Sequence, residues 1–180
     1  MKVETGILIS GTGGQGIIAA GEFLSEALFR AGYEVINARS YGSEARGGSC
    51  KSEVLVSDSE IYDLQLAEPD VLIALSMPAF RRYQGRAKSG ALVIVDSAVL
   101  EGLSKDEVRQ DIRLNPVPAT EMAKDLGNVI VANMVLLGAF AGLSEILSLG
   151  DLKDVVNELM RPSMKEINLR ALDIGHSCTR

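Results

Sequence analysis

Apolar residues follow two spacings along this chain. Short aliphatic runs predict buried strands, and apolar residues that recur every three or four positions predict amphipathic helices. The first such pair is a strand over 3–9 and a helix over 17–31, which Gly32 would end as a C-terminal cap. The same spacings predict further strands over 35–38, 51–57, 71–75, 91–95 and 113–117, and further helices over 77–87, 104–110, 120–126, 152–160 and 163–177.

This alternation of strands and helices predicts an α/β fold, a three-layer α/β/α sandwich that is Rossmann-like with a mostly parallel sheet. Residues 71–75 and 91–95 are entirely aliphatic, as expected of central parallel strands that are covered on both faces. No repeat, low-complexity segment or linker interrupts the pattern, so we expect a single domain over 1–180.

The most apolar segment, 128–147, has no charged residue between Asp125 and Glu145. We interpret it as the apolar helix that such a fold needs beneath its sheet, and not as a membrane span. Asn133 and two glycines interrupt it, and it lacks flanking Lys/Arg bias and aromatic belts. A buried Asn133 amide must find partners, either in a nearby loop or in a ligand.

A glycine-rich stretch joins the first strand to the first helix. Gly11-Thr12-Gly13-Gly14-Gln15-Gly16 fits the spacing G-x-G-x-x-G. Glycine is costly to order, so this density indicates a tight turn or a close approach of the backbone to something. At the start of a helix, that something is often a phosphate, because the free N–H groups and the helix dipole favour an anion. A tight turn without a ligand is the alternative.

The dinucleotide fingerprint is incomplete. It requires an acidic residue near the end of the second strand, where the carboxylate holds the ribose hydroxyls. Here Glu34 lies at the start of that strand, and Ala38-Arg39 at its end. The sequence therefore indicates a phosphate-bearing ligand but does not support NAD.

A second glycine-rich stretch runs from Ser40 to Ser49 and has neither helical nor strand periodicity, which predicts a loop. Its Arg46 could contact a phosphate or a carboxylate through the planar guanidinium, with Glu44 as the group that orients it. A solvated loop with a weak Glu44–Arg46 pair is the alternative. Residue type alone leaves both interpretations open.

The densest positive cluster lies on the helix predicted over 77–87 and just beyond it. It consists of Arg81, Arg82, Arg86 and Lys88. We interpret it as a solvated helix face, with docking onto an acidic partner as the alternative.

Composition excludes several classes of function. The net charge of −6 argues against general nucleic-acid binding, which needs a basic face. Cys50 and Cys178 are far apart and no C-x-x-C occurs, so we expect free thiols and no iron–sulfur cluster held by this chain alone. With His176 as the single histidine, neither a histidine metal site nor a Ser–His–Asp triad is expected. We expect a cytoplasmic chain without a leader peptide.

Taken together, the two glycine-rich stretches resemble the gamma subunit of 2-oxoacid:ferredoxin oxidoreductases. The resemblance extends over nearly the whole chain, and the paired loops carry it more specifically than either motif alone. Further similar segments are Lys51–Val54, Val56–Asp58, Asp70–Leu75, Ala132–Gly138 and Asn168–Ala171.

Tyr41 followed by Glu44-Ala45-Arg46-Gly47-Gly48 looks most like the 2-oxoglutarate branch of that family. The pyruvate branch more often has phenylalanine and a second arginine in this loop. Ser43 departs from the proline that is usual at its position.

The resemblance implies one subunit of an enzyme that oxidatively decarboxylates a 2-oxoacid with coenzyme A and passes the electrons to ferredoxin. Thiamine diphosphate would bind in the alpha and beta subunits, and iron–sulfur clusters in beta or delta chains. This chain would hold no cofactor alone and supply no catalytic residue; it would close over the active site and help to hold coenzyme A at the subunit junction. The residues expected there are Gly11, Thr12, Gly13, Gly14, Gln15, Gly16, Tyr41, Glu44, Arg46, Gly47 and Asn133.

Three alternatives remain at this stage. The first is the pyruvate or indolepyruvate branch of the same family. The second is an independent NAD(P)- or flavin-dependent oxidoreductase. Arg39 favours it, because this residue could contact a 2′-phosphate. The third is a structural adaptor whose glycine loops only pack against partners.

Overall fold

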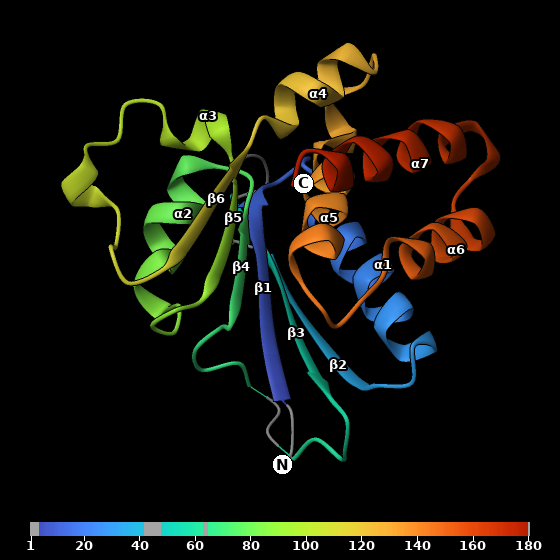
Figure 1. Ribbon diagram of the computed structural model, residues 1–180, viewed down its shortest axis with the longest axis horizontal. Coiled ribbons are helices and arrows are strands. Elements are labelled where there is room, and N and C mark those ends of the chain that lie inside the picture. The colour runs from blue at the N-terminus through green and yellow to red at the C-terminus, as the bar shows by residue number, and fades with distance from the viewer. Residues whose placement is uncertain (1–3, 42–47, 63–64, 180) are drawn as a thin grey trace.

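The computed structural model describes residues 4–41, 48–62 and 65–179. Within these residues a six-stranded sheet has the order β2-β3-β1-β4-β5-β6, with helices on both of its faces (Figure 1). The strands are β1 (Glu4–Thr12), β2 (Glu34–Tyr41), β3 (Ser49–Ser57), β4 (Val71–Ala74), β5 (Leu92–Asp96) and β6 (Arg113–Val117). The predicted α/β sandwich is confirmed.

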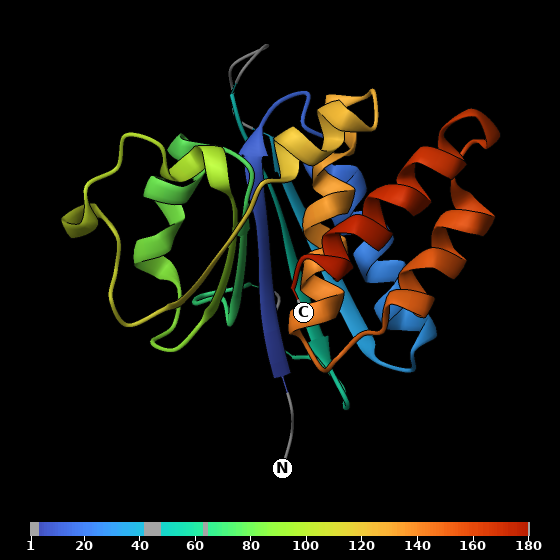
Figure 2. The same cartoon turned by 45° about the horizontal axis from the view of Figure 1, so that its top comes forward.

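The helices divide unequally between the two faces. Figures 1 and 2 show the longer helices on one side of the sheet and short helices on the other, with α4 (Ala119–Asp125) above the carboxyl ends of the strands. The first group is α1 (Ile17–Arg30), α5 (Ala132–Leu143), α6 (Leu149–Leu159) and α7 (Pro162–Ser177). The second group is α2 (Met77–Tyr83) and α3 (Ser97–Leu100).

The second strand from one edge of this sheet, β3, is antiparallel to the other strands. β1, β4, β5 and β6 are parallel neighbours, as predicted, but β3 lies between β1 and β2 and is antiparallel to both. The sheet is therefore mixed, and β2 lies two strands away from β1. Gly21 of α1 packs directly on Ser52 of β3, where a side chain at position 21 would collide with the serine.

The core has one layer on each face of the sheet. Alternate residues of β1 point to opposite faces, so Ile7 and Ile9 pack with the four-helix side while Leu8 packs with the α2 side. Every residue of α5 from Ala132 to Ala141 is buried. This confirms an apolar helix beneath the sheet, although the helix is shorter than the segment 128–147. A 3-10 turn (Val129–Val131) precedes it, and it ends at Leu143.

Several element boundaries differ from the prediction. The helix expected over 77–87 tightens into a 3-10 turn (Gln84–Arg86), and the one expected over 104–110 is a single 3-10 turn (Lys105–Glu107). The Gln84 side chain explains the second difference, because it bonds the Glu107 carbonyl at 2.7 Å and the Arg109 amide at 3.2 Å and so competes with helical hydrogen bonds. Helix α6 begins earlier than predicted because Ser148 and Asp151 form a capping box.

Helices α5 and α7 approach each other backbone to backbone. A Cβ atom added at Gly138 would meet the Leu172 carbonyl, and one added at Gly175 would meet the Val135 carbonyl. Only glycine allows this distance, because both obstacles are main-chain atoms that cannot rotate away.

We therefore predict that Gly175→Ala lowers the free energy of unfolding by about 1–3 kcal/mol through overpacking. Urea denaturation measures this, with Gly85→Ala as the control, since no described atom lies within 4 Å of a Cβ at Gly85. Equal stability of the two variants would show that the helices are not in contact there.

Candidate functional site

The glycine turn lies where the chain changes direction across the sheet. After β1 the chain continues through α1 on one face, whereas β4 leads into α2 on the other face. The carboxyl ends of β1 and β4 are therefore a topological switch point, the usual place for ligands in open α/β sheets. The turn over residues 12–16 lies at this point, as the sequence predicted.

Left-handed backbone at two glycines shapes the turn. Gly14 has φ +94° and Gly16 has φ +69°, values that other residues adopt only with strain. Gly13 and Gly14 are exposed, and open space surrounds the position of a Cβ on Gly14. Gly16 is the N-cap of α1. The turn thus brings bare backbone to the surface at the start of a helix.

The side chain of Gln15 holds this turn in place. Its Oε1 accepts hydrogen bonds from the Thr12 amide at 2.7 Å and from the Thr12 hydroxyl at 3.0 Å. Its Nε2 donates to the Leu75 carbonyl at 2.9 Å, directly after β4. One side chain therefore closes the turn on itself and ties it to the neighbouring strand.

Asn133 holds the other end of the turn. Its Nδ2 donates to the Gly16 carbonyl at 2.9 Å, and its Oδ1 accepts from the Met134 amide at 2.7 Å. The buried amide therefore bonds a nearby loop, which is one of the two interpretations from the sequence. Because Asn133 lies on α5, this contact also links the turn to the core.

The backbone amides at the turn include two that are candidates for binding an anion. The Gly13 amide donates to the Gly48 carbonyl at 3.0 Å, and the Gln15 amide to the Thr12 carbonyl at 3.3 Å. The amides of Gly14 and Gly16 have no partner among the described residues. Helix α1 has no side-chain cap and no acidic residue in its first turn. The positive end of its dipole is thus available to a phosphate or a carboxylate.

The space beside the turn is small. A pocket of about 80 Å³ is lined by Gly14, Gln15, Leu75, Thr120, Val129, Ile130 and Ala132. Cofactor pockets usually measure about 300–1,000 Å³. Val129 and Ile130 at its rim are 50% and 52% exposed, which is high for large apolar side chains. A cofactor held at the turn would therefore need a second chain to enclose it.

Asp96 has a structural role at the same edge of the sheet. Its buried carboxylate accepts from the Ala98 amide at 3.2 Å, from the Thr120 amide at 2.9 Å and from the Thr120 hydroxyl. It thereby caps α3 and joins it to the start of α4. Both carboxylate oxygens are thus engaged by Ala98 and Thr120 in holding the fold.

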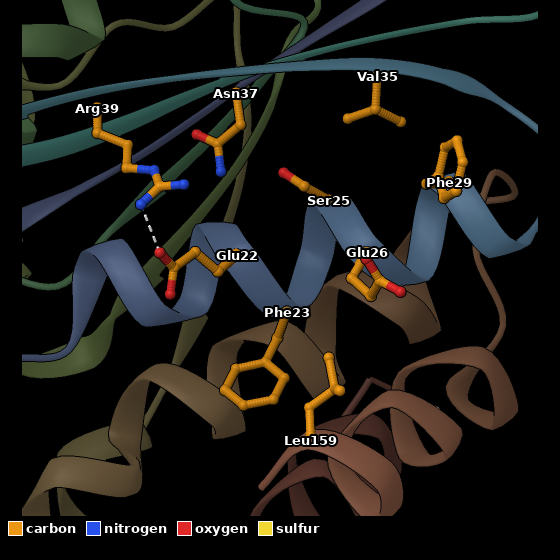
Figure 3. Close-up of a pocket in the computed structure, with 9 residues that line it drawn as sticks. All are labelled: Glu22, Phe23, Ser25, Glu26, Phe29, Val35, Asn37, Arg39 and Leu159. Atoms are coloured by element: carbon orange, nitrogen blue, oxygen red, sulfur yellow. Dashed lines mark hydrogen bonds and ion pairs between the residues drawn. The ribbon is translucent and has the colours of Figure 1, made fainter.

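A second pocket, of about 490 Å³, lies between α1 and β2 (Figure 3). Arg39, the one feature that leaned toward a dinucleotide, lies in this pocket and pairs with Glu22 at 2.5 Å. β3 separates β2 from β1, so strand spacing puts Arg39 about 10 Å from the strand that carries the glycine turn. The sheet order therefore argues against the dinucleotide alternative.

The sequence-predicted site residues divide into two groups. Gly11, Gln15, Gly16 and Asn133 come together at the turn, with Thr12, Gly13 and Gly14 between them. The backbone of Tyr41 ends β2 and pairs with Cys50. Glu44, Arg46 and Gly47 lie outside the described residues. Contact of any of these residues with a ligand stays a prediction.

The cysteines offer no nucleophile to this site. Both are free, as expected, and Cys50 is buried on β3. Burial raises the pKa of the Cys50 thiol, so it stays protonated and unreactive at neutral pH. Across the described ranges, no group of three His, Cys, Asp or Glu residues could hold a metal ion, and no helix is long and apolar enough to cross a membrane.

We predict that Gln15→Ala lowers the free energy of unfolding by about 1–3 kcal/mol and speeds hydrogen exchange of the Thr12 amide, because a buried donor and an acceptor lose their partner. Gln110→Ala is the matched control, since that amide bonds only carbonyls of its own exposed loop. Unchanged exchange at Thr12 would contradict the bridging role of Gln15.

Comparison with known proteins places this geometry in a family. The family model for pyruvate ferredoxin/flavodoxin oxidoreductase matches residues 6–178. The 2-oxoglutarate synthase subunit KorC of Methanocaldococcus jannaschii is 35% identical over 100% of this chain and 96% of its own length. Relatives named as indolepyruvate or ketoisovalerate oxidoreductase subunits are 28–31% identical.

Two solved structures have the same fold. The keto/oxoacid ferredoxin oxidoreductase gamma subunit of Geobacter sulfurreducens is 33% identical, with a TM-score of 0.83 over 97% of this chain and 98% of its own. The 2-oxoglutarate:ferredoxin oxidoreductase of Magnetococcus marinus, with 2-oxoglutarate, coenzyme A and succinyl-CoA bound, is 29% identical, with a TM-score of 0.86 over 98% of this chain and 31% of its own. The chain thus belongs to the pyruvate ferredoxin/flavodoxin oxidoreductase family, as a gamma subunit of the 2-oxoacid:ferredoxin oxidoreductase type.

Proposed function

We propose that this subunit serves the oxidative decarboxylation of 2-oxoglutarate and that its glycine turn helps to bind coenzyme A. The reaction converts 2-oxoglutarate and coenzyme A into succinyl-CoA and carbon dioxide, and two electrons pass to ferredoxin. The chain would close over the active site of the assembled complex. It would act by binding and enclosing the reactants rather than by a catalytic residue of its own.

The open N-terminus of α1 carries the coenzyme A part of this proposal. Coenzyme A is rich in phosphate, and phosphates fit a helix start that lacks both a capping side chain and an acidic residue. The exposed backbone at Gly13 and Gly14 lets such a group approach closely. The bound coenzyme A in the Magnetococcus marinus enzyme supports this choice of ligand.

Sequence similarity supports 2-oxoglutarate as the substrate. Relatives named 2-oxoglutarate synthase subunit KorC are 35–36% identical to this chain, above the indolepyruvate and ketoisovalerate subunits. Tyr41 and the loop that follows it favour the same branch. We propose that Tyr41, Glu44, Arg46 and Gly47 line the junction with the partner subunits.

The partner subunits would supply the chemistry that this chain lacks. Thiamine diphosphate, bound in the alpha and beta subunits, would stabilise the carbanion left by decarboxylation, and iron–sulfur clusters in beta or delta chains would carry the electrons. The small pocket beside the turn and the exposed Val129 and Ile130 fit a surface that other subunits cover. A purely structural adaptor is the competing function, since its glycine loops would also favour tight packing.

One substitution separates ligand binding from packing. Ala19 is exposed in the first turn of α1. Ala19→Glu should stabilise the chain by about 0.3–1 kcal/mol through the helix dipole. The same carboxylate should repel a phosphate, so we expect the KM for coenzyme A of the assembled complex to rise about tenfold.

Ala19→Gln is the control, because it has nearly the same shape without the charge. Enzyme assays with methyl viologen as the electron acceptor give the KM values, and urea denaturation gives the stabilities. If the two variants have the same KM for coenzyme A, the turn is a packing element and the adaptor function is favoured.

The substrate is tested on the same complex. We expect kcat/KM for 2-oxoglutarate to exceed that for pyruvate, indolepyruvate and 2-ketoisovalerate by about tenfold or more. A preference for pyruvate or indolepyruvate would keep the family and overturn the choice of branch.

A further inference from the structure

One cation of the positive cluster on and beyond α2 has no acidic partner among the residues that the structure describes. Arg81 pairs with Glu107 at 2.6 Å. Arg86 and Lys88 also have carboxylate partners, Glu53 and Asp70. No carboxylate of the described residues pairs with Arg82, which is exposed. Its contacts are the Ser49 hydroxyl at 3.3 Å and the ring of Tyr83, 5.5 Å from the guanidinium carbon to the ring centre.

Arg82 reaches the edge of the sheet that carries the glycine turn. Ser49 is the first residue of β3 and lies opposite Thr12 in the register of β1 and β3. The residue before it, Gly48, accepts the hydrogen bond from the Gly13 amide. The guanidinium therefore lies beside the turn on the α2 face, whereas α1 begins on the other face.

A second cation, Lys51, lies on the same strand as the Ser49 that Arg82 contacts. Lys51 lies two residues beyond Ser49 and pairs with Glu53 at 2.8 Å. Glu53 also pairs with Arg86 at 3.3 Å, so Lys51 and Arg86 share one carboxylate. Arg86 also donates hydrogen bonds to the Leu66 and Ala67 carbonyls, so its role is structural. Among the described residues Arg82 makes no hydrogen bond to a backbone carbonyl, and its one side-chain partner is the Ser49 hydroxyl.

Hydrogen bonding beneath these cations is also incomplete. Ser10 is fully buried on β1, opposite Lys51, and no described residue forms a hydrogen bond with its hydroxyl. Buried polar groups in proteins are nearly always paired, so an exception asks for a reason. A polar network that is completed only when an anion binds would provide one.

We propose that Arg82, with Lys51 beside it, binds the 3′-phosphate of coenzyme A. This inference rests on the proposed function, which brings coenzyme A to the turn. A glycine-rich helix start suits the pyrophosphate, because several amides share its charge. The 3′-phosphate is a compact monoester, which a planar guanidinium can contact through two parallel hydrogen bonds. The pyrophosphate would thus bind at the start of α1 on one face of the sheet, and the 3′-phosphate would bind Arg82 on the other face.

The test compares Arg82→Ala with Arg81→Ala in the assembled complex. Arg81 is the adjacent residue on α2, equally exposed, and its charge is already paired. We measure the KM for coenzyme A and for 3′-dephospho-coenzyme A with 2-oxoglutarate and methyl viologen. Arg82→Ala should raise the KM for coenzyme A about tenfold, leave kcat within twofold, and leave the KM for 3′-dephospho-coenzyme A unchanged. Arg81→Ala should change neither KM.

Arg82→Lys controls for a complex that fails to assemble. It keeps the positive charge and loses only the bidentate geometry of the guanidinium. It should raise the KM for coenzyme A by less than Arg82→Ala does. An equal rise of both KM values in Arg82→Ala, or no rise in either, overturns the assignment to the 3′-phosphate. If Ala19→Glu raises the KM while Arg82→Ala does not, this inference fails and the proposed function stands. If neither variant raises it, both fail.

Discussion

The rest of the structure depends on the position of β3 between β1 and β2. This strand is antiparallel to both neighbours and begins at the carboxyl edge of the sheet, where Gly48, the residue before it, accepts a hydrogen bond from the Gly13 amide of the glycine turn. Helix α1 crosses β3 and comes close to it at Gly21, over Ser52. With β2 displaced to the edge, Arg39 near its end lies too far from the glycine turn to hold a ligand there in the way that a dinucleotide fold requires. The turn therefore belongs to a site of another kind.

Two side-chain amides convert this topology into a defined turn. Gln15 ties it to the end of β4, and Asn133 ties it to α5. Both amides use their own hydrogen bonds to hold backbone, which leaves the first amides of α1 without a partner in the part of the chain that the structure describes. The result is a turn that exposes backbone amides beside a pocket of little volume. A ligand held there would need a second chain to enclose it, as in a subunit of a larger enzyme.

Much of the fold could be predicted from the sequence because its signals are local. The strand, turn and helix over residues 4–30 follow from hydrophobic spacing and from the placement of glycine. The position of β3 could not be predicted, because its pairing with β1 joins residues that are far apart in the sequence, such as Glu4 and Ser57, which are 53 positions apart. The missed helix α3 depends on the Asp96 carboxylate as its cap.

In the candidate site, too, the local features could be predicted and the long-range contacts could not. Glycine spacing identified the turn, but the Leu75 carbonyl that holds Gln15 lies 60 residues away and leaves no local signal. The sequence also singled out the cluster that contains Arg82. It could not show which cation lacks a carboxylate partner among the described residues, because the carboxylates that neutralise the others come from distant segments around Glu53, Asp70 and Glu107.

The central claim is that the glycine turn binds a phosphate of coenzyme A, and one measurement tests it most directly. A structure of the assembled complex with coenzyme A bound would place the ligand relative to the first amides of α1. The account predicts a phosphate oxygen within about 2.7–3.2 Å of at least one amide between Gly14 and Ala19. Coenzyme A bound elsewhere, with the turn packed against a partner subunit's polypeptide, would contradict the account and leave this chain the role of an adaptor.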